Sequence, residues 1–69
     1  MKKQAAIDHA GSTGALAALL GIKSAAVSQW DEYPPDMRQL QIERLTSGAL
    51  KAEPGCYARV VGLELKAAA

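Results

Sequence analysis

Residues 13–30 contain two short runs of helically spaced apolar side chains, and a single glycine, Gly21, separates them. Residues three or four apart lie on one face of a helix, so the apolar positions of both runs can face each other. Glycine ends helices readily because it adopts the left-handed backbone conformation at little steric cost. The segment therefore predicts a helix-turn-helix unit with one small core built from Leu16, Leu20, Ile22, Val27 and Trp30.

Smaller side chains in the same segment support this arrangement. Ala17 stands where the second helix would cross the first, and a residue without atoms beyond the β-carbon permits a close approach. Ser12 or Thr13 can cap the first helix of the unit, and Ser24 is expected to cap the second.

The combination of a small residue, a glycine four positions later, a β-branched residue and a tryptophan is more specific than the glycine alone. On these residues, the segment from Gly21 to Trp30 resembles the Cro repressors of temperate bacteriophages, especially their helical branch, and the related YdaS-type prophage regulators. The likeness continues through residues 42–51 and covers roughly residues 2–51. It implies a small, lambda-repressor-like transcriptional repressor that binds double-stranded operator DNA, usually as a homodimer.

The apolar spacing, the glycines and the prolines predict further helices on both sides of the motif. Residues 3–10 are expected to form a helix with Ala6, Ile7 and Ala10 facing inward, ended by Gly11. The motif helices are expected over residues 13–20 and from residue 24 or 25 to residue 31. The two prolines in residues 32–35 exclude regular helix there, and a fourth helix is expected over residues 37–46, with Pro35 in its first turn.

The last third of the chain fits two structures. A fifth helix from about Glu53 or Pro54 suits the spacing of its apolar residues, whereas residues 57–65 can also alternate as a strand of a β-hairpin. The alanine-rich end and the likeness to the helical branch favour the helix. We therefore expect an all-α, five-helix domain over residues 1–62 with its motif at 13–31, followed by a tail, residues 63–69, that can include non-native residues.

Composition excludes several other classes of protein. One cysteine, Cys56, and one histidine, His9, provide neither an internal disulfide nor a zinc-ligand set, so no metal and no cofactor are expected. No convergent set of catalytic groups and no glycine-rich phosphate loop is visible, which argues against an enzyme. No run of about 20 apolar residues suggests a membrane span, and the expected location is the bacterial cytoplasm, with the nucleoid.

The net charge of +1 is low for a protein that binds nucleic acid. The charges are unevenly distributed, however. Residues 1–30 hold three lysines against one aspartate, whereas residues 31–69 hold five basic and six acidic side chains. Helix amino termini also attract phosphate without a formal charge. We therefore expect moderate affinity for DNA with a marked dependence on salt.

In a helix-turn-helix unit the second helix enters the major groove with its amino-terminal half, and the first helix spans the DNA backbone. The expected base-reading side chains are therefore Lys23, Ser24, Ala25, Ser28 and Gln29. The expected phosphate contacts are Ser12, Thr13, Gly14 and, from the fourth helix, Arg38. The expected operator is a pseudo-palindrome with half-sites about 34 Å apart.

Some residues and segments have a second interpretation. Trp30 is expected in the core rather than against DNA, and Met37, Leu40 and Leu45 are assigned to the core in preference to a dimer surface. An alternative function is an antitoxin-type interaction module that regulates its own operon. Its carboxyl segment, residues 49–66, would then become ordered on a protein partner.

Overall fold

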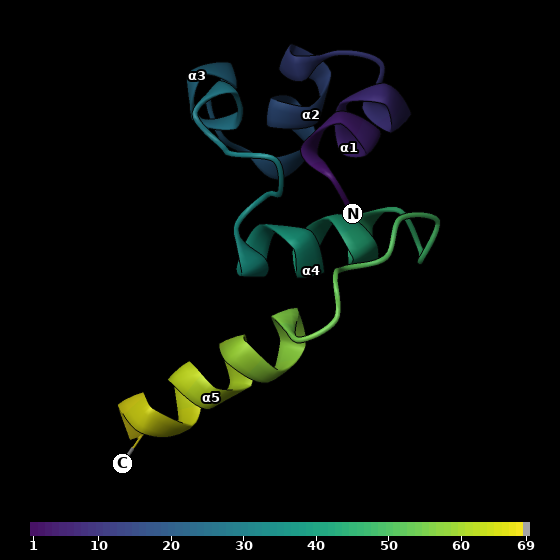
Figure 1. Cartoon of the computed structure of the whole chain (residues 1–69). Coiled ribbons are helices and arrows are strands. Elements are labelled where there is room, and N and C mark those ends of the chain that lie inside the picture. The colour runs from purple at the N-terminus through teal and green to yellow at the C-terminus, as the bar shows by residue number, and fades with distance from the viewer. Residues whose placement is uncertain (69) are drawn as a thin grey trace.

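The computed structural model describes residues 1–68, and side chains up to residue 62, as five α-helices (Figure 1). They are α1 (Lys3–Ala10), α2 (Thr13–Leu20), α3 (Ser24–Ser28), α4 (Asp36–Leu45) and α5 (Cys56–Ala68). The prediction of an all-α, five-helix domain is confirmed. The β-hairpin alternative is wrong, because the described residues contain no strand.

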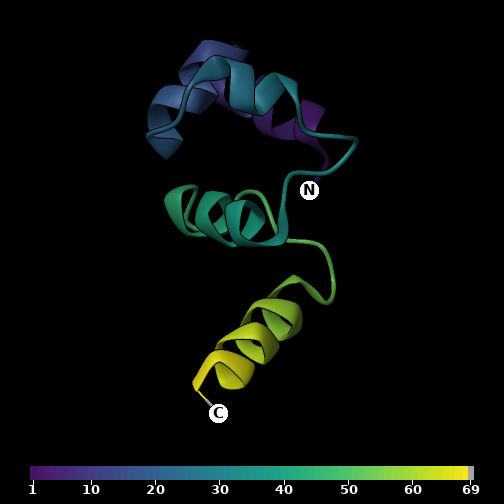
Figure 2. The ribbon, with the colours of Figure 1, turned by 90° about the vertical axis from the view of Figure 1, so that its left-hand side faces the viewer.

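The helices lie in three tiers. Helices α1, α2 and α3 form one end of the molecule, which we call the head, α4 crosses beneath it, and α5 extends from α4 away from the head (Figures 1 and 2). The amino terminus lies between the head and α4. The molecule is elongated, with principal extents of 40 × 23 × 19 Å.

The first two helices have the expected bounds. Both end at a glycine in the left-handed conformation, Gly11 with φ 104° and Gly21 with φ 70°. The Ser12 hydroxyl oxygen caps α2 by accepting a hydrogen bond from the Ala15 N–H at 3.0 Å. The predicted sharp turn between the motif helices is thus present.

The head has the predicted core. Leu16, Leu20 and Val27 are buried, and Ile22 and Trp30 pack against them partly exposed. Ala17 is only 3% exposed, as expected where α2 and α3 approach each other closely. Ala6 is also buried, with Ile7 and Ala10 beside it, so α1 braces the motif as predicted.

Helix α3 is shorter than predicted and ends at Ser28 instead of Asp31. The Trp30 N–H donates to the carbonyl of Val27, which makes a tighter turn than an α-helix. Lys3 then binds two carbonyl groups of the following residues, because its side chain donates to Trp30 and its backbone N–H donates to Glu32. These bonds hold the chain in a non-helical path. The capping role expected for Ser24 is also wrong, because Lys23 occupies the cap position and Ser24 is the first helical residue.

Helix α4 begins at Asp36 and ends at Leu45, one residue earlier at each end than predicted, with Pro35 at the cap position instead of in the first turn. Its inward face is also different. Gln39 and Ile42 are buried at 2% exposure each, whereas Met37 is 63% exposed and Leu45 52%. Assigning Met37 and Leu45 to the core was therefore wrong.

Helix α5 begins at Cys56, two or three residues later than predicted. Gly55 has a φ of 93°, which is incompatible with a helix, and the Glu53 N–H bonds to the side chain of Gln39 in the linker before α5. Cys56 is fully buried, and its thiol donates to Asp36 of α4. The expected tail, residues 63–69, lies outside the described side chains, although the backbone of α5 continues to Ala68.

Candidate nucleic-acid interface

One side of α3 faces solvent along its whole length. The five residues predicted to read bases are all exposed, and they are Lys23, Ser24, Ala25, Ser28 and Gln29. On a helix of 3.6 residues per turn, residues 24, 25, 28 and 29 form one continuous arc. Val27, on the opposite side, is 0% exposed and anchors α3 in the head. The structure thus gathers four of these side chains on one surface, and Lys23 is exposed at the cap position just before them.

The start of α2 presents a second group of predicted contacts. Ser12 and Gly14 are exposed and Thr13 is half-buried. The N–H groups of Thr13 and Gly14 have no hydrogen-bond partner among the described residues, and an added β-carbon on Gly14 would meet nothing within 4 Å. An unobstructed helix amino terminus of this kind can accept an anion.

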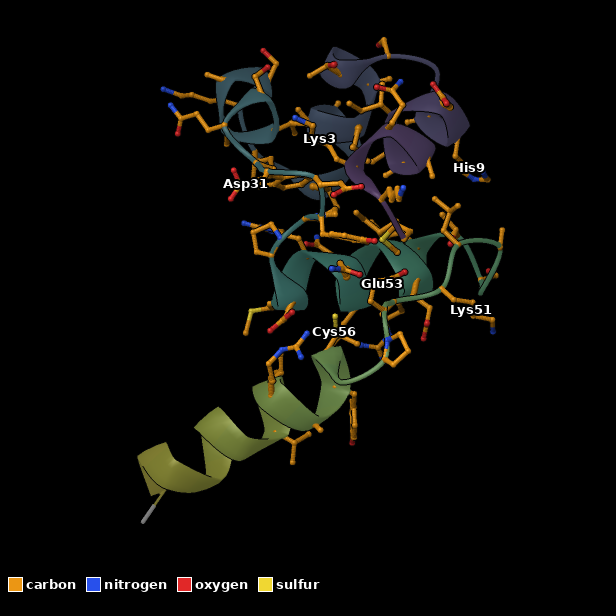
Figure 3. The ribbon with its side chains drawn as sticks, viewed as in Figure 1. Lys3, His9, Asp31, Lys51, Glu53 and Cys56 are labelled. Carbon is orange, nitrogen blue, oxygen red and sulfur yellow. The ribbon has the colours of Figure 1, made fainter. Side chains whose placement is uncertain are left out.

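The two groups lie at the same end of the molecule. Figures 1 and 2 both show α3 and the beginning of α2 at the end opposite α5. A hydrogen bond connects α1 to the end of this surface. The side chain of Lys3 on α1 donates to the carbonyl of Trp30, just after α3, at 2.9 Å (Figure 3). Together with the buried Val27, this bond positions α3 on the head.

Arg38 is placed differently from the other predicted contacts. It is half-buried on α4, and its guanidinium donates to the side-chain oxygen of Gln41 at 2.7 Å. It lines a shallow groove of about 530 Å³ along α4, together with Pro35, Met37, Leu40, Gln41 and Arg44. The structure thus places Arg38 on α4, outside the group formed by α3 and the start of α2.

Two polar clusters were missed by the sequence analysis. In the first, Gln39 and Glu53 surround the ammonium group of Met1. In the second, Arg59 of α5 binds the carboxylate of Asp36 on α4, with Nη2 and Oδ1 2.8 Å apart, and the buried Cys56 thiol donates to the same carboxylate. No local pattern reveals these clusters, because the bonds that join their different segments link residues 14 to 52 positions apart.

The second cluster changes the acidity of its members. The hydrogen bond from Arg59, with that from Cys56, lowers the pKa of Asp36 to about 2. Burial, together with the neighbouring Asp36 carboxylate, raises the pKa of the Cys56 thiol.

The single histidine, His9, lies exposed at the end of α1 (Figure 3). In the part of the chain that the structure describes, no three His, Cys, Asp or Glu side chains are grouped to hold a metal ion. Nor is any described helix long and apolar enough to cross a membrane.

Comparisons with known proteins agree with this arrangement. The family described as DNA-binding transcriptional regulator Cro matches residues 2–61. The chain is also similar to the regulatory protein cro of Salmonella phage P22, with 46% identity over 57 residues, 83% of this chain and 93% of the relative. No solved structure matches the chain significantly. Because the family match covers most of the sequence, the chain belongs to the Cro family of DNA-binding transcriptional regulators.

Proposed function

We propose that this protein is a sequence-specific repressor that binds operator DNA with α3 in the major groove. The observation that carries the proposal is the continuous exposed arc of α3 over a buried Val27, next to the open amino terminus of α2. A protein of this kind needs no catalytic group, because occupation of a promoter excludes polymerase by steric overlap.

Three side chains supply different recognition chemistry: Gln29 and Ala25 on the arc, and Lys23 just before it. The Gln29 amide can donate to and accept from the edge of an adenine, and the Ala25 methyl group can contact a thymine methyl group. Lys23 can donate to guanine acceptors or to phosphate. A good bidentate pair discriminates against the wrong base by about 1–3 kcal/mol. Ser24 and Ser28, on the same arc, complete the proposed base-reading group.

Phosphate contacts are proposed at the start of α2. The unpaired N–H groups of Thr13 and Gly14 can donate to one phosphate, and the Ser12 hydroxyl keeps its proton for the same anion because it acts as an acceptor toward Ala15. Arg38 is proposed as an outer phosphate contact from α4. These contacts set the register of α3 on the duplex without reading its sequence.

We also propose that two copies bind together on a pseudo-palindrome with half-sites about 34 Å apart. Large apolar side chains on α4 and α5 support this, since Met37, Leu45 and Tyr57 are 63%, 52% and 70% exposed. They lie on the helices beneath the head, which leaves α3 of each copy available to DNA. The alternative in which residues 49–66 become ordered on a partner is less well supported, because α5 is helical and packed on α4 in the single chain.

Selection from random duplex DNA at near-physiological salt tests the function. The wild-type protein is expected to enrich a short inverted repeat, and Gln29→Ala is expected to lose the preference at one base of each half-site. Gln4→Ala removes an exposed glutamine of α1 and is the matched control, for which the enriched motif should not change. If no motif is enriched and binding disappears as salt rises, sequence-specific repression is excluded.

A further inference from the structure

The first three residues of the chain are all held by distant parts of the fold. Lys3 binds the carbonyl groups of Trp30 and Glu32, and Lys2 pairs with the Glu32 carboxylate at 3.2 Å. Met1 is 7% exposed and belongs to the apolar core cluster that joins the head to Ile42 of α4. The amino terminus is thus a structural element, and Figure 1 shows it between the head and α4.

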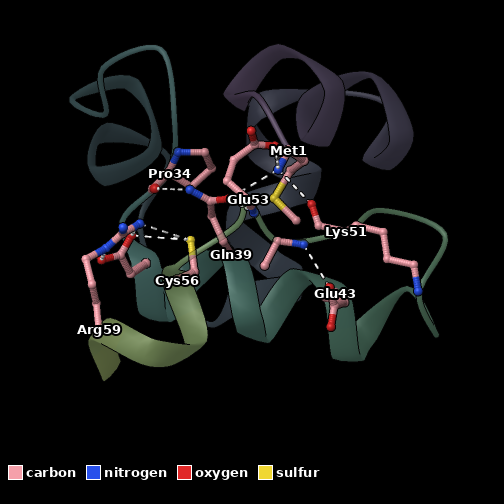
Figure 4. Close-up of polar contacts among 10 residues, drawn as sticks. Met1, Pro34, Gln39, Glu43, Lys51, Glu53, Cys56 and Arg59 are labelled. Atoms are coloured by element: carbon pink, nitrogen blue, oxygen red, sulfur yellow. Dashed lines mark hydrogen bonds and ion pairs between the residues drawn. The ribbon is translucent and has the colours of Figure 1, made fainter. Parts of the chain in front are cut away.

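The ammonium group of Met1 has three acceptors around it (Figure 4). They are the Lys51 carbonyl at 2.7 Å, a Glu53 carboxylate oxygen at 2.8 Å and the Gln39 side-chain oxygen at 3.2 Å. A primary ammonium has three N–H donors, so the acceptors match its donors in number. The Met1 side chain is only 3% exposed, so this ion pair is shielded from water on one side.

Gln39 fixes this arrangement from α4. Its Nε2 donates to the Pro34 carbonyl at 2.9 Å, and its Oε1 accepts from both Met1 and the Glu53 N–H. The ammonium therefore joins three segments: the start of the head, the buried face of α4 and the linker before α5. No buried side-chain nitrogen or oxygen among the described residues lacks a hydrogen bond, so every partner of this network is in use.

We propose that the α-amino nitrogen of Met1 is a modification-sensitive site whose free ammonium form locks the head onto α4 and the α5 linker. An acyl group such as formyl or acetyl converts the ammonium into a neutral amide with a single N–H donor. It removes the charge that faces Glu53 and leaves two of the three acceptors without their donor. Acylation of this nitrogen therefore weakens the attachment of the head to α4 and to the α5 linker, which then depends on the apolar core that the head shares with Ile42.

The test uses the full chain made by chemical synthesis with a free or an acetylated amino terminus, and thermal unfolding is followed without DNA. Acetylation is expected to lower the Tm by about 5 °C or more. In a Glu53→Gln background the same acetylation is expected to lower the Tm by at most half as much, because the charge partner is already absent.

Two controls distinguish the loss of the Met1 hydrogen bonds from other causes of a lower Tm. A des-amino chain, in which hydrogen replaces the α-amino group, adds no atoms and is expected to be destabilised like the acetylated one. Lys2→Gln removes one charge from an exposed pair and is expected to change the Tm by less than about 2 °C.

A des-amino chain with the Tm of the wild type would overturn the proposal, even if the acetylated chain failed to fold. So would an acetylation effect of equal size with Glu53 and with Gln at position 53. Because no DNA is present, these outcomes do not depend on the proposed repressor function.

Discussion

At the scale of single residues, Gly14 lowers the stability of α2, and a role in DNA binding can explain why a glycine is found there. Glycine inside a helix is less stable than alanine by roughly 0.5–1 kcal/mol, and nothing within 4 Å would obstruct a β-carbon here. We expect Gly14→Ala to raise the free energy of unfolding by about that amount. We also expect it to weaken operator binding about tenfold, because the methyl group would keep a phosphate from the N–H groups. Urea unfolding and DNA titration measure the two effects.

Gly62 is the matched control for this substitution. It is also a helical glycine with nothing within 4 Å of its β-carbon, but it lies on α5, away from the proposed interface. Gly62→Ala should raise stability to a similar extent without changing affinity. Equal affinity for DNA in wild type and Gly14→Ala would show that no phosphate lies close to α2 at this point.

Gln39 joins three separate parts of the fold: the amino terminus, the loop before α4 and the linker before α5. Gln39→Met preserves approximate size but leaves the Pro34 carbonyl, the Glu53 N–H and one Met1 donor unpaired. Burying such groups without partners costs about 1–3 kcal/mol, so the urea midpoint should fall markedly. Gln41→Met, on the same helix and half-buried, should change the free energy of unfolding by less than about 0.5 kcal/mol. A similar midpoint for both variants would contradict the role given to Gln39.

At the scale of the elements, the Asp36 carboxylate ties α5 to α4 and makes their contact depend on pH. Its pKa is about 2 in the fold and near 3.8 in the unfolded chain, because Arg59 and Cys56 stabilise the charged form. A lowered folded pKa adds stability that is present above about pH 4 and is lost as the pH falls toward 2. We expect the free energy of unfolding of the wild type to fall over this interval more steeply than that of Asp36→Asn.

Urea unfolding at several pH values between 5 and 2.5 checks this expectation. Asp31→Asn removes an exposed carboxyl group outside the cluster and should keep the pH dependence of the wild type. Parallel curves for wild type and Asp36→Asn would mean that the Asp36–Arg59 pair contributes nothing to the attachment of α5.

Helix α4 shows why an element can be predicted while its orientation cannot. Apolar spacing places Met37, Leu40 and Leu45 on one face, and a sequence argument turns that face inward. The structure instead buries Gln39 beside Ile42, because a polar group is needed to bind the amino terminus and the linker. Besides the nearby Pro34 carbonyl, the partners of Gln39 are Met1 and Glu53, and nothing local to α4 indicates these two.

At the scale of the whole molecule, the low net charge limits how strongly DNA binding can depend on salt. Lys23 and Arg38 are the cations proposed to meet phosphate, and each neutralised phosphate contributes about −0.9 to the slope of log affinity against log salt. We expect a slope of about −2 for each bound chain, measured by titration between 50 and 200 mM salt. Arg38→Gln should reduce it by about 1, and an unchanged slope would exclude Arg38 from the interface.

The local elements of this protein follow from the sequence alone. Leu16, Leu20, Val27 and the glycines at 11 and 21 predict α1, α2, their ends and the core of the head, because helix spacing and left-handed turns depend on neighbouring residues. The exposed arc of α3 follows in the same way, since a buried Val27 leaves Ser24, Ala25 and Ser28 outside.

Only the tertiary structure decided how α4 faces the head, where α3 ends and α5 begins, and what holds the layers together. Trp30 and Glu32 give their carbonyl groups to Lys3, and Met1 lies 38 residues from Gln39 and 52 from Glu53. Bonds between residues so far apart form when the whole chain folds, and they leave no periodic pattern in the sequence. They also override local helix preferences, because a buried carbonyl, amide or ammonium must find a partner wherever the fold provides one.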